Sequence, residues 1–144
     1  MYDIELKEHI EKSVASTITR LVVEYGYSIN ETIELIHLST MDKEWERCNL
    51  RYITGNGGEL ARKILYVTEK YREEIKFEKM EYEKYIWLGK LIFKVAYKKN
   101  APLYNTAIEI LNKMNDEIDN IITLAVINGI NVDSYVNKYI ATTY

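Results

Sequence analysis

The sequence predicts an all-α protein: an irregular bundle of five to seven helices around a long central helical segment, within a single domain spanning residues 1–144. Three observations support this class. Apolar residues recur at helical spacing through most of the chain. One proline and six glycines are fewer turn residues than a sheet-rich fold usually needs. Apolar residues make up 47% and charged residues 28%, as in ordinary globular domains with a buried core.

The first two elements are predicted to form a helical pair. Asp3–Tyr25 has helical periodicity, and Gly26 directly after it can adopt the left-handed conformation that ends a helix. Ser28 lies three residues before Glu31, which is the signature of a capping box, and the second helix should run to about Ser39. The residues expected to be buried are Leu6, Ile10, Val14, Ile18, Leu21, Val22 and Tyr25 in the first helix, and Ile29, Ile33 and Ile36 in the second.

A short third helix is expected from Met41 to Leu50, with Trp45 and Cys48 on one side. The next stretch, Arg51–Gly58, is rich in glycine and is predicted to be a loop. We interpret it as a flexible connector, because its spacing matches neither a Walker A motif nor a dinucleotide-binding fingerprint.

The stretch Glu59–Asn100 dominates the chain, with no proline and a single glycine, Gly89, in 42 residues. As one straight helix it would be roughly 60 Å long, whereas a compact chain of this length has a radius of gyration of about 15 Å. We therefore expect a break or a sharp bend between Ile75 and Tyr82, where Glu78 interrupts the apolar stripe. The stripe consists of Leu60, Ile64, Val67, Tyr71 and Ile75, continued by Tyr82, Ile86, Gly89 and Phe93.

Two helices are predicted after this segment. Pro102 suits a first helical turn, and the periodicity predicts one helix over Pro102–Asn128. Gly129 should close that helix, and Asn131 can cap a short last helix over Val132–Ile140. The inward-facing residues of the longer helix are expected to be Ala107, Leu111, Met114, Ile118, Ile121 and Ala125.

The single cysteine, Cys48, excludes an internal disulfide and suits a reducing compartment. The first residues lack the basic region and the apolar run of a signal peptide, and no window approaches the roughly 18 uninterrupted apolar residues of a membrane-spanning helix. We therefore expect a cytoplasmic protein.

Catalytic and metal-binding patterns are weak. Glu34 and His37 form one Glu-x-x-His pair, but a di-iron bundle needs that motif twice, and His9 has no glutamate three residues before it. Arg47 lies beside Cys48, yet no base that would activate the thiol can be identified. The sequence predicts no catalytic residues, no metal and no cofactor, and hence a protein that is not an enzyme.

The strongest functional signal is the distribution of charge. Residues 51–99 have a net charge of +5, whereas residues 1–50 have −5 and residues 100–144 have −3. On a helix, Lys90, Lys94 and Lys98 share one face that also contains Trp87, with Lys84 nearby. These residues are our candidate partner-binding site, with Trp87 as its anchor. The alternative is a solvated lysine face on which a neighbouring helix or a second copy covers Trp87.

These observations favour a non-enzymatic role: a small protein that acts by binding another protein or a second copy of itself as a homodimer. An inhibitor or regulator of bacterial or phage type fits the size and composition. The alternative is a nucleic-acid-binding regulator that uses the basic helix 84–99, with lysines on phosphates and Trp87 stacked on a base. No membrane partner is expected.

Overall fold

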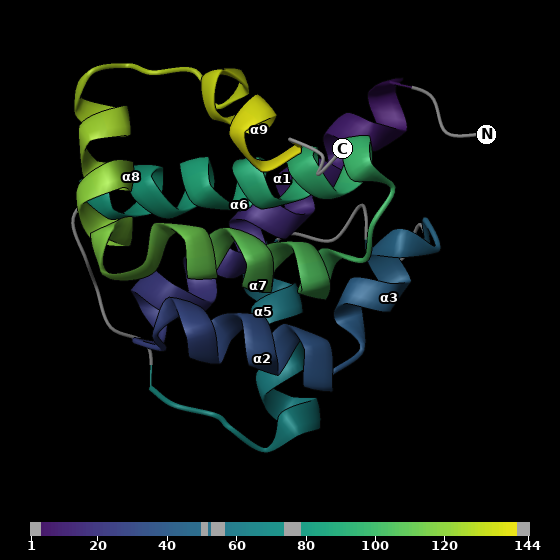
Figure 1. The fold of residues 1–144 in the computed structure, drawn as a ribbon. Coiled ribbons are helices and arrows are strands. Elements are labelled where there is room, and N and C mark those ends of the chain that lie inside the picture. The colour runs from purple at the N-terminus through teal and green to yellow at the C-terminus, as the bar shows by residue number, and fades with distance from the viewer. Residues whose placement is uncertain (1–3, 50–51, 53–56, 74–78, 141–144) are drawn as a thin grey trace.

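The computed structural model describes residues 4–49, 52, 57–73 and 79–140. These residues form helices and contain no strand, which confirms the all-α class. Helix α6 lies at the centre, with α1 behind it and the other helices around them (Figure 1). The helices are α1 (Ile4–Thr19), η1 (Arg20–Glu24), α2 (Ile29–Leu38), α3 (Met41–Glu46), α5 (Gly57–Thr68), α6 (Lys79–Lys99), α7 (Leu103–Met114), η2 (Asn115–Glu117), α8 (Ile118–Ile127) and α9 (Asp133–Ile140).

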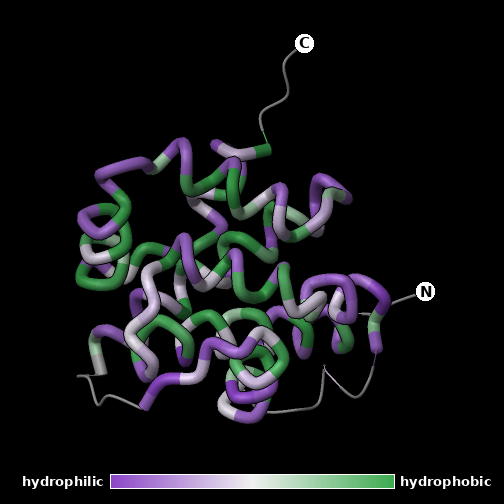
Figure 2. The backbone as a smooth tube through the Cα atoms, turned by 90° about the horizontal axis from the view of Figure 1, so that it is seen from below, coloured by the Kyte–Doolittle hydropathy of each residue, from purple (hydrophilic) through white to green (hydrophobic). Residues whose placement is uncertain are grey.

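Apolar positions recur along the helices rather than gathering in one segment (Figure 2). They build one core to which α1, α2, α5, α6, α7, α8 and α9 all contribute buried residues. None of the helices in the described part of the chain is long and apolar enough to cross a bilayer.

The corner between the first two helices forms as predicted. The first helix continues from α1 through the π-helical turn η1, and Gly26 then has a φ of 72°. Ser28 and Glu31 form both hydrogen bonds of a capping box at the start of α2. Local turn chemistry therefore determines this corner.

The described residues of the long central segment form two helices, which confirms that the segment is not one helix. The first helix ends earlier than predicted, and α6 already begins at Lys79, within the stretch Ile75–Tyr82 where the break was expected. Helix α5 stops at Thr68, and the backbone N–H of Lys70 donates a hydrogen bond to the carbonyl of Leu65 (3.0 Å). Glu69 provides the left-handed residue for this helix end, with a φ of 58°. Tyr71 is therefore not part of a helical stripe; it is exposed. Residues 74–78, which include Ile75 and Glu78, lie outside the described residues.

Two predicted boundaries near α3 are wrong. Helix α3 ends at Glu46 rather than Leu50, and Cys48, with a φ of 57°, lies beyond it. Gly57 and Gly58, expected in the loop, form the first turn of α5 and are buried. A Cβ on Gly57 would lie 2.0 Å from Oγ of Ser16, so the glycine allows α5 to start against α1. Residues 51 and 53–56 of the predicted loop lie outside the described residues.

The single helix predicted over Pro102–Asn128 is also wrong, because the chain bends after Met114 into η2 and then α8. The bend occurs at Asn115, whose φ is 47°. Asparagine tolerates positive φ better than most residues. The helical spacing of apolar residues continues across the bend, so the sequence pattern gives no sign of it. The turn after α8 is confirmed: Gly129 has a φ of 63°, and the Asn131 side chain accepts a hydrogen bond from the Asp133 N–H (2.8 Å).

Helices α1 and α6 run antiparallel and very close together. A Cβ on Gly89 would lie 2.6 Å from Cα of Ala15, too close for any real contact. The same register places the ammonium of Lys7 4.4 Å from the ring centre of Tyr97 at one end of the pair. Of the predicted stripe on α6, Phe93 is buried, whereas Tyr82 and Ile86 are only partly buried. The residues of α6 that are most deeply buried are Leu88, Leu91, Ile92, Val95 and Ala96.

We expect Gly89→Ala to lower the free energy of unfolding by about 1–3 kcal/mol, the usual effect of overpacking, in spite of a helix-propensity gain of about 1 kcal/mol. The new methyl group would meet the backbone of Ala15, which cannot move aside as a flexible side chain does. Urea unfolding followed by circular dichroism measures the change. Glu83→Ala, at an exposed position of the same helix, is the control and should change stability by less than about 0.5 kcal/mol.

Thr40→Gly should raise the free energy of unfolding by up to about 1 kcal/mol. Thr40 has a φ of 63° and makes no side-chain capping bond to α3. The left-handed conformation costs a residue with a Cβ about 1–2 kcal/mol, which exceeds the entropic cost of glycine, about 0.5–1 kcal/mol. Thermal unfolding compares the variants. Thr40→Ala keeps the Cβ, so an equal gain from this control would rule out backbone strain as the cause.

Candidate functional site

The predicted lysine face on α6 is partly neutralised within the chain. Lys84 pairs with Glu81 (3.5 Å), and its side chain is only 11% exposed. Lys94 lies 3.3 Å from Glu11 on α1 and 3.7 Å from Asp133 on α9. Lys90 is half-buried and Lys98 is exposed. The structure thus brings the lysines to one region, but two of the four meet carboxylates of the same chain.

Trp87 is buried, with 7% of its surface exposed, so little of the ring is accessible to a partner. Helix α9 and the turn before it cover the ring. The indole N–H donates a hydrogen bond to the carbonyl of Ile130 (2.9 Å), and the Tyr135 ring packs edge-on at 5.1 Å between ring centres. The alternative in which a neighbouring helix covers Trp87 is confirmed. Helical spacing could not show this, because it does not reveal where α9 packs.

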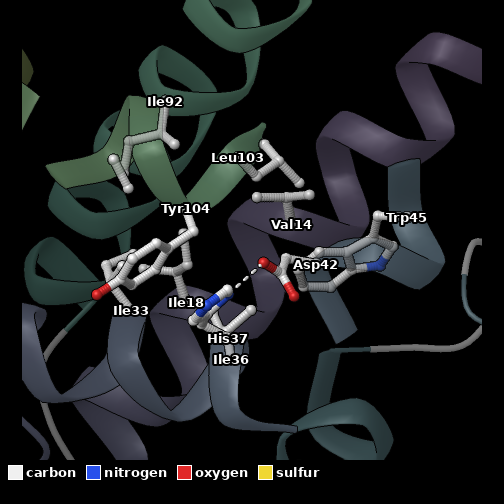
Figure 3. A pocket seen from close by; sticks show the side chains of 11 residues that line it. Val14, Ile18, Ile33, Ile36, His37, Asp42, Trp45, Ile92, Leu103 and Tyr104 are labelled. Carbon is white, nitrogen blue, oxygen red and sulfur yellow. Dashed lines mark hydrogen bonds and ion pairs between the residues drawn. The ribbon is translucent and has the colours of Figure 1, made fainter. Parts of the chain in front are cut away.

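A small cavity lies between α2, α3 and α7, with side chains of α1 and α6 also lining it (Figure 3). Asp42, which is 3% exposed, points its Oδ2 at Nδ1 of His37 (2.8 Å), and the Tyr104 ring stacks on His37 with 3.9 Å between ring centres. Oδ1 of Asp42 has no hydrogen-bond partner among the described residues. The cavity volume is about 20 Å³, which is enough for one water molecule and far below that of an ordinary ligand site.

The Glu34-x-x-His37 pair does not converge on a metal position. Glu34 accepts a hydrogen bond from the Tyr104 hydroxyl (2.9 Å), whereas His37 contacts Asp42. Within the described residues there is no group of three or more His, Cys, Asp or Glu side chains that could hold a metal ion. His9 lies elsewhere, on α1, with its ring nitrogen 3.9 Å from Glu5.

A larger groove runs between α2 and the non-helical residues 69–72, and we call it the α2 groove. Its volume is about 650 Å³. Leu38 is 60% exposed and Tyr71 is 63% exposed, while Leu35 and Tyr27 are buried. The groove therefore combines an apolar floor with two large apolar side chains that remain in contact with solvent. It is lined by Tyr27, Asn30, Glu31, Glu34, Leu35, Leu38, Glu69, Lys70, Tyr71 and Arg72.

Several contacts hold residues 70–72 against the corner between α1 and α2. The Tyr27 hydroxyl donates a hydrogen bond to the carbonyl of Lys70. The Arg72 guanidinium lies 3.8 Å from the ring centre of Tyr27 and donates a hydrogen bond to the carbonyl of Gly26 (3.2 Å). The Tyr71 ring packs edge-on against Tyr25, with 6.1 Å between ring centres. Side chains of the corner (Tyr25 and Tyr27) and of the segment itself (Tyr71 and Arg72) thus hold residues 70–72, which form one wall of the groove, in place.

Charged groups line the polar rim of this groove. Hydrogen bonds from the Ser28 backbone and side chain lower the pKa of Glu31, and Arg72, 4.0 Å away, acts in the same direction. Glu31 therefore stays ionised well below neutral pH. The hydrogen bond to Glu34 raises the pKa of the Tyr104 hydroxyl, which thus remains a donor at neutral pH.

Sequence reasoning missed the α2 groove because its two walls are far apart in the chain. Tyr27 and Lys70 are separated by 43 positions. The one local signal was Tyr71, and helical periodicity assigned it to the core. If the break had been predicted at Glu69 instead of after Ile75, Tyr71 would have been placed outside the helix. It would then have been a candidate binding residue.

Comparison of the chain with protein-family models, with curated proteins and with solved structures gives no match. The case for a function therefore rests on the geometry of the described residues, among which the α2 groove has a volume of about 650 Å³ and two large exposed apolar side chains, Leu38 and Tyr71.

Trp87→Ala should reduce the free energy of unfolding by about 3–5 kcal/mol, because it removes a large buried ring together with its hydrogen bond to Ile130. Urea unfolding provides the measurement. Lys98→Ala, an exposed member of the same predicted face, should change stability by less than about 0.5 kcal/mol. Equal stability of the Trp87→Ala and parent proteins would mean that α9 does not cover the ring.

Proposed function

We propose that this chain acts by binding another protein and that the α2 groove is the binding site. The observation that carries the proposal is the exposure of Leu38 and Tyr71 beside a groove of about 650 Å³. An apolar patch rimmed by polar groups is typical of a surface that a partner covers. A non-enzymatic inhibitor or regulator in the cytoplasm, of bacterial or phage type, is the role that we associate with such a site.

Pre-organisation of the groove supports this proposal. Tyr27 and Arg72 already fix the backbone of the wall, so little conformational entropy would be lost when a partner binds. A partner that covered Leu38 and Tyr71 would remove two large apolar side chains from water, at about 25 cal/mol for each Å² of apolar surface. These two residues are therefore the expected anchors of the interface.

The alternatives have less support. The small cavity beside His37 and Asp42 has room for a water molecule but not for an ordinary substrate. Binding of nucleic acid through α6 would have to use Lys90 and Lys98, since Lys84 and Lys94 are paired and Trp87 is covered. No observation favours either function over protein binding.

A random-peptide library displayed on phage, panned against the immobilised chain, tests the proposal. Peptides that bind the parent protein should bind Leu38→Asp more than about tenfold more weakly, because a charge then replaces an apolar anchor. Fluorescence anisotropy with the synthetic peptides measures the affinities. Leu38 is mostly exposed, so this variant should keep the helix content and stability of the parent.

Leu124→Asp is the matched control, because Leu124 is also a leucine exposed on a helix but lies on α8, outside the α2 groove. It should leave peptide binding unchanged. The proposal would be wrong if panning returned no specific peptide, or if the selected peptides depended on Leu124 and ignored Leu38.

A further inference from the structure

A second groove adjoins the α2 groove at the start of α2. The two grooves share Tyr27, Asn30 and Glu31, so they lie next to each other around this end of the helix. The second groove has a volume of about 530 Å³ and extends to η2 and the start of α8. We call it the acidic groove because of the residues described next.

The acidic groove contains carboxylates without matching cations. Glu31, Asp116 and Asp119 line it, and no Lys or Arg is among its described lining residues. Arg72 partly neutralises Glu31 from the side of the α2 groove, whereas Asp116 and Asp119 are exposed and have no ion pair among the described residues. Over both grooves the described lining residues include five carboxylates and two cationic groups.

The Tyr85 side chain lines the same groove and is close enough to Asp119 to be affected by its charge. Its pKa is raised, first by burial and then by the carboxylates of Asp119 and Glu81. A cationic side chain that entered this groove would gain from the same negative charges. Asparagine side chains at positions 30, 112 and 115 add hydrogen-bond acceptors for an ammonium or guanidinium group.

We infer that the partner segment is a basic, apolar peptide: a large apolar side chain seated at Leu38 and Tyr71, with Lys or Arg side chains lying in the acidic groove. This inference rests on the proposed function and specifies the chemistry of the partner. The apolar part supplies most of the affinity, and the charge complementarity selects among apolar segments and fixes their direction.

A second copy of the chain fits this surface less well. The cations of α6 that are not paired in the described structure, Lys90 and Lys98, lie on a different part of the chain from Asp116 and Asp119. A contact between those two surfaces would be head-to-tail, and such contacts build rings or open filaments rather than closed two-fold dimers. Light scattering should therefore show a monomer, and the partner should be a different protein.

The test uses synthetic versions of the peptides selected on the parent chain. Those that depend on Leu38 should carry two or more Lys or Arg on one side of a large apolar residue. Replacing these basic residues by Gln, or changing the protein to Asp116→Asn/Asp119→Asn, should weaken binding about tenfold at low salt. High salt should reduce the difference. Fluorescence anisotropy provides the affinities.

Glu117→Gln is the control, because Glu117 is exposed in the same turn but does not line the groove. It should leave binding unchanged. Two results would overturn the inference and leave the proposed function standing. In the first, the selected peptides require Leu38 but lack basic residues. In the second, they bind the Asp116→Asn/Asp119→Asn variant as tightly as the parent. Loss of all dependence on Leu38 would overturn both. A dimer that peptide binding dissociates would make a second copy the occupant and would also overturn the inference.

Discussion

The structure depends on one point of close helix packing, at Ala15 and Ser16 near the end of α1. Helix α6 approaches Ala15 through Gly89, and α5 approaches the next residue, Ser16, through Gly57. At each contact even one added carbon would be closer than real atoms come. Three helices can therefore meet on two consecutive residues only because the two approaching positions lack side chains. This junction fixes where the remaining helices can pack.

The position of the α2 groove follows from this junction. Helix α1 leads through η1 and Gly26 into α2, while α5 and α6, both held against α1, are joined by the chain that includes residues 69–73. One end of that connection must therefore pass close to the corner between α1 and α2. Tyr27 and Arg72 form their contacts at this place, and the groove is the space that remains beside α2.

Sequence reasoning succeeded where local chemistry decides the structure. Gly26, Ser28, Gly129 and Asn131 predicted both corners, because turn and capping interactions involve residues only a few positions apart. It failed at the ends of α5 and α7, where Glu69 and Asn115 have positive φ without being glycine. The covering of Trp87 and the walls of the α2 groove could not be predicted, since both depend on contacts between segments about 40 positions apart.

The left-handed residues at helix ends also bear on the order of folding. Among the described residues, five with positive φ are not glycine: Thr40, Cys48, Glu69, Asn100 and Asn115. Positive φ is unfavourable for Thr40, Cys48 and Glu69, and asparagine tolerates it without requiring it, so an isolated fragment has little local reason to end its helix at these positions. Tertiary contacts, such as those of Tyr27 and Arg72 just after Glu69, have to impose these ends. We therefore expect the helices to reach their final boundaries only when the core forms, late in folding and at the same time. Folding should then be strongly cooperative, although most of the described residues are helical.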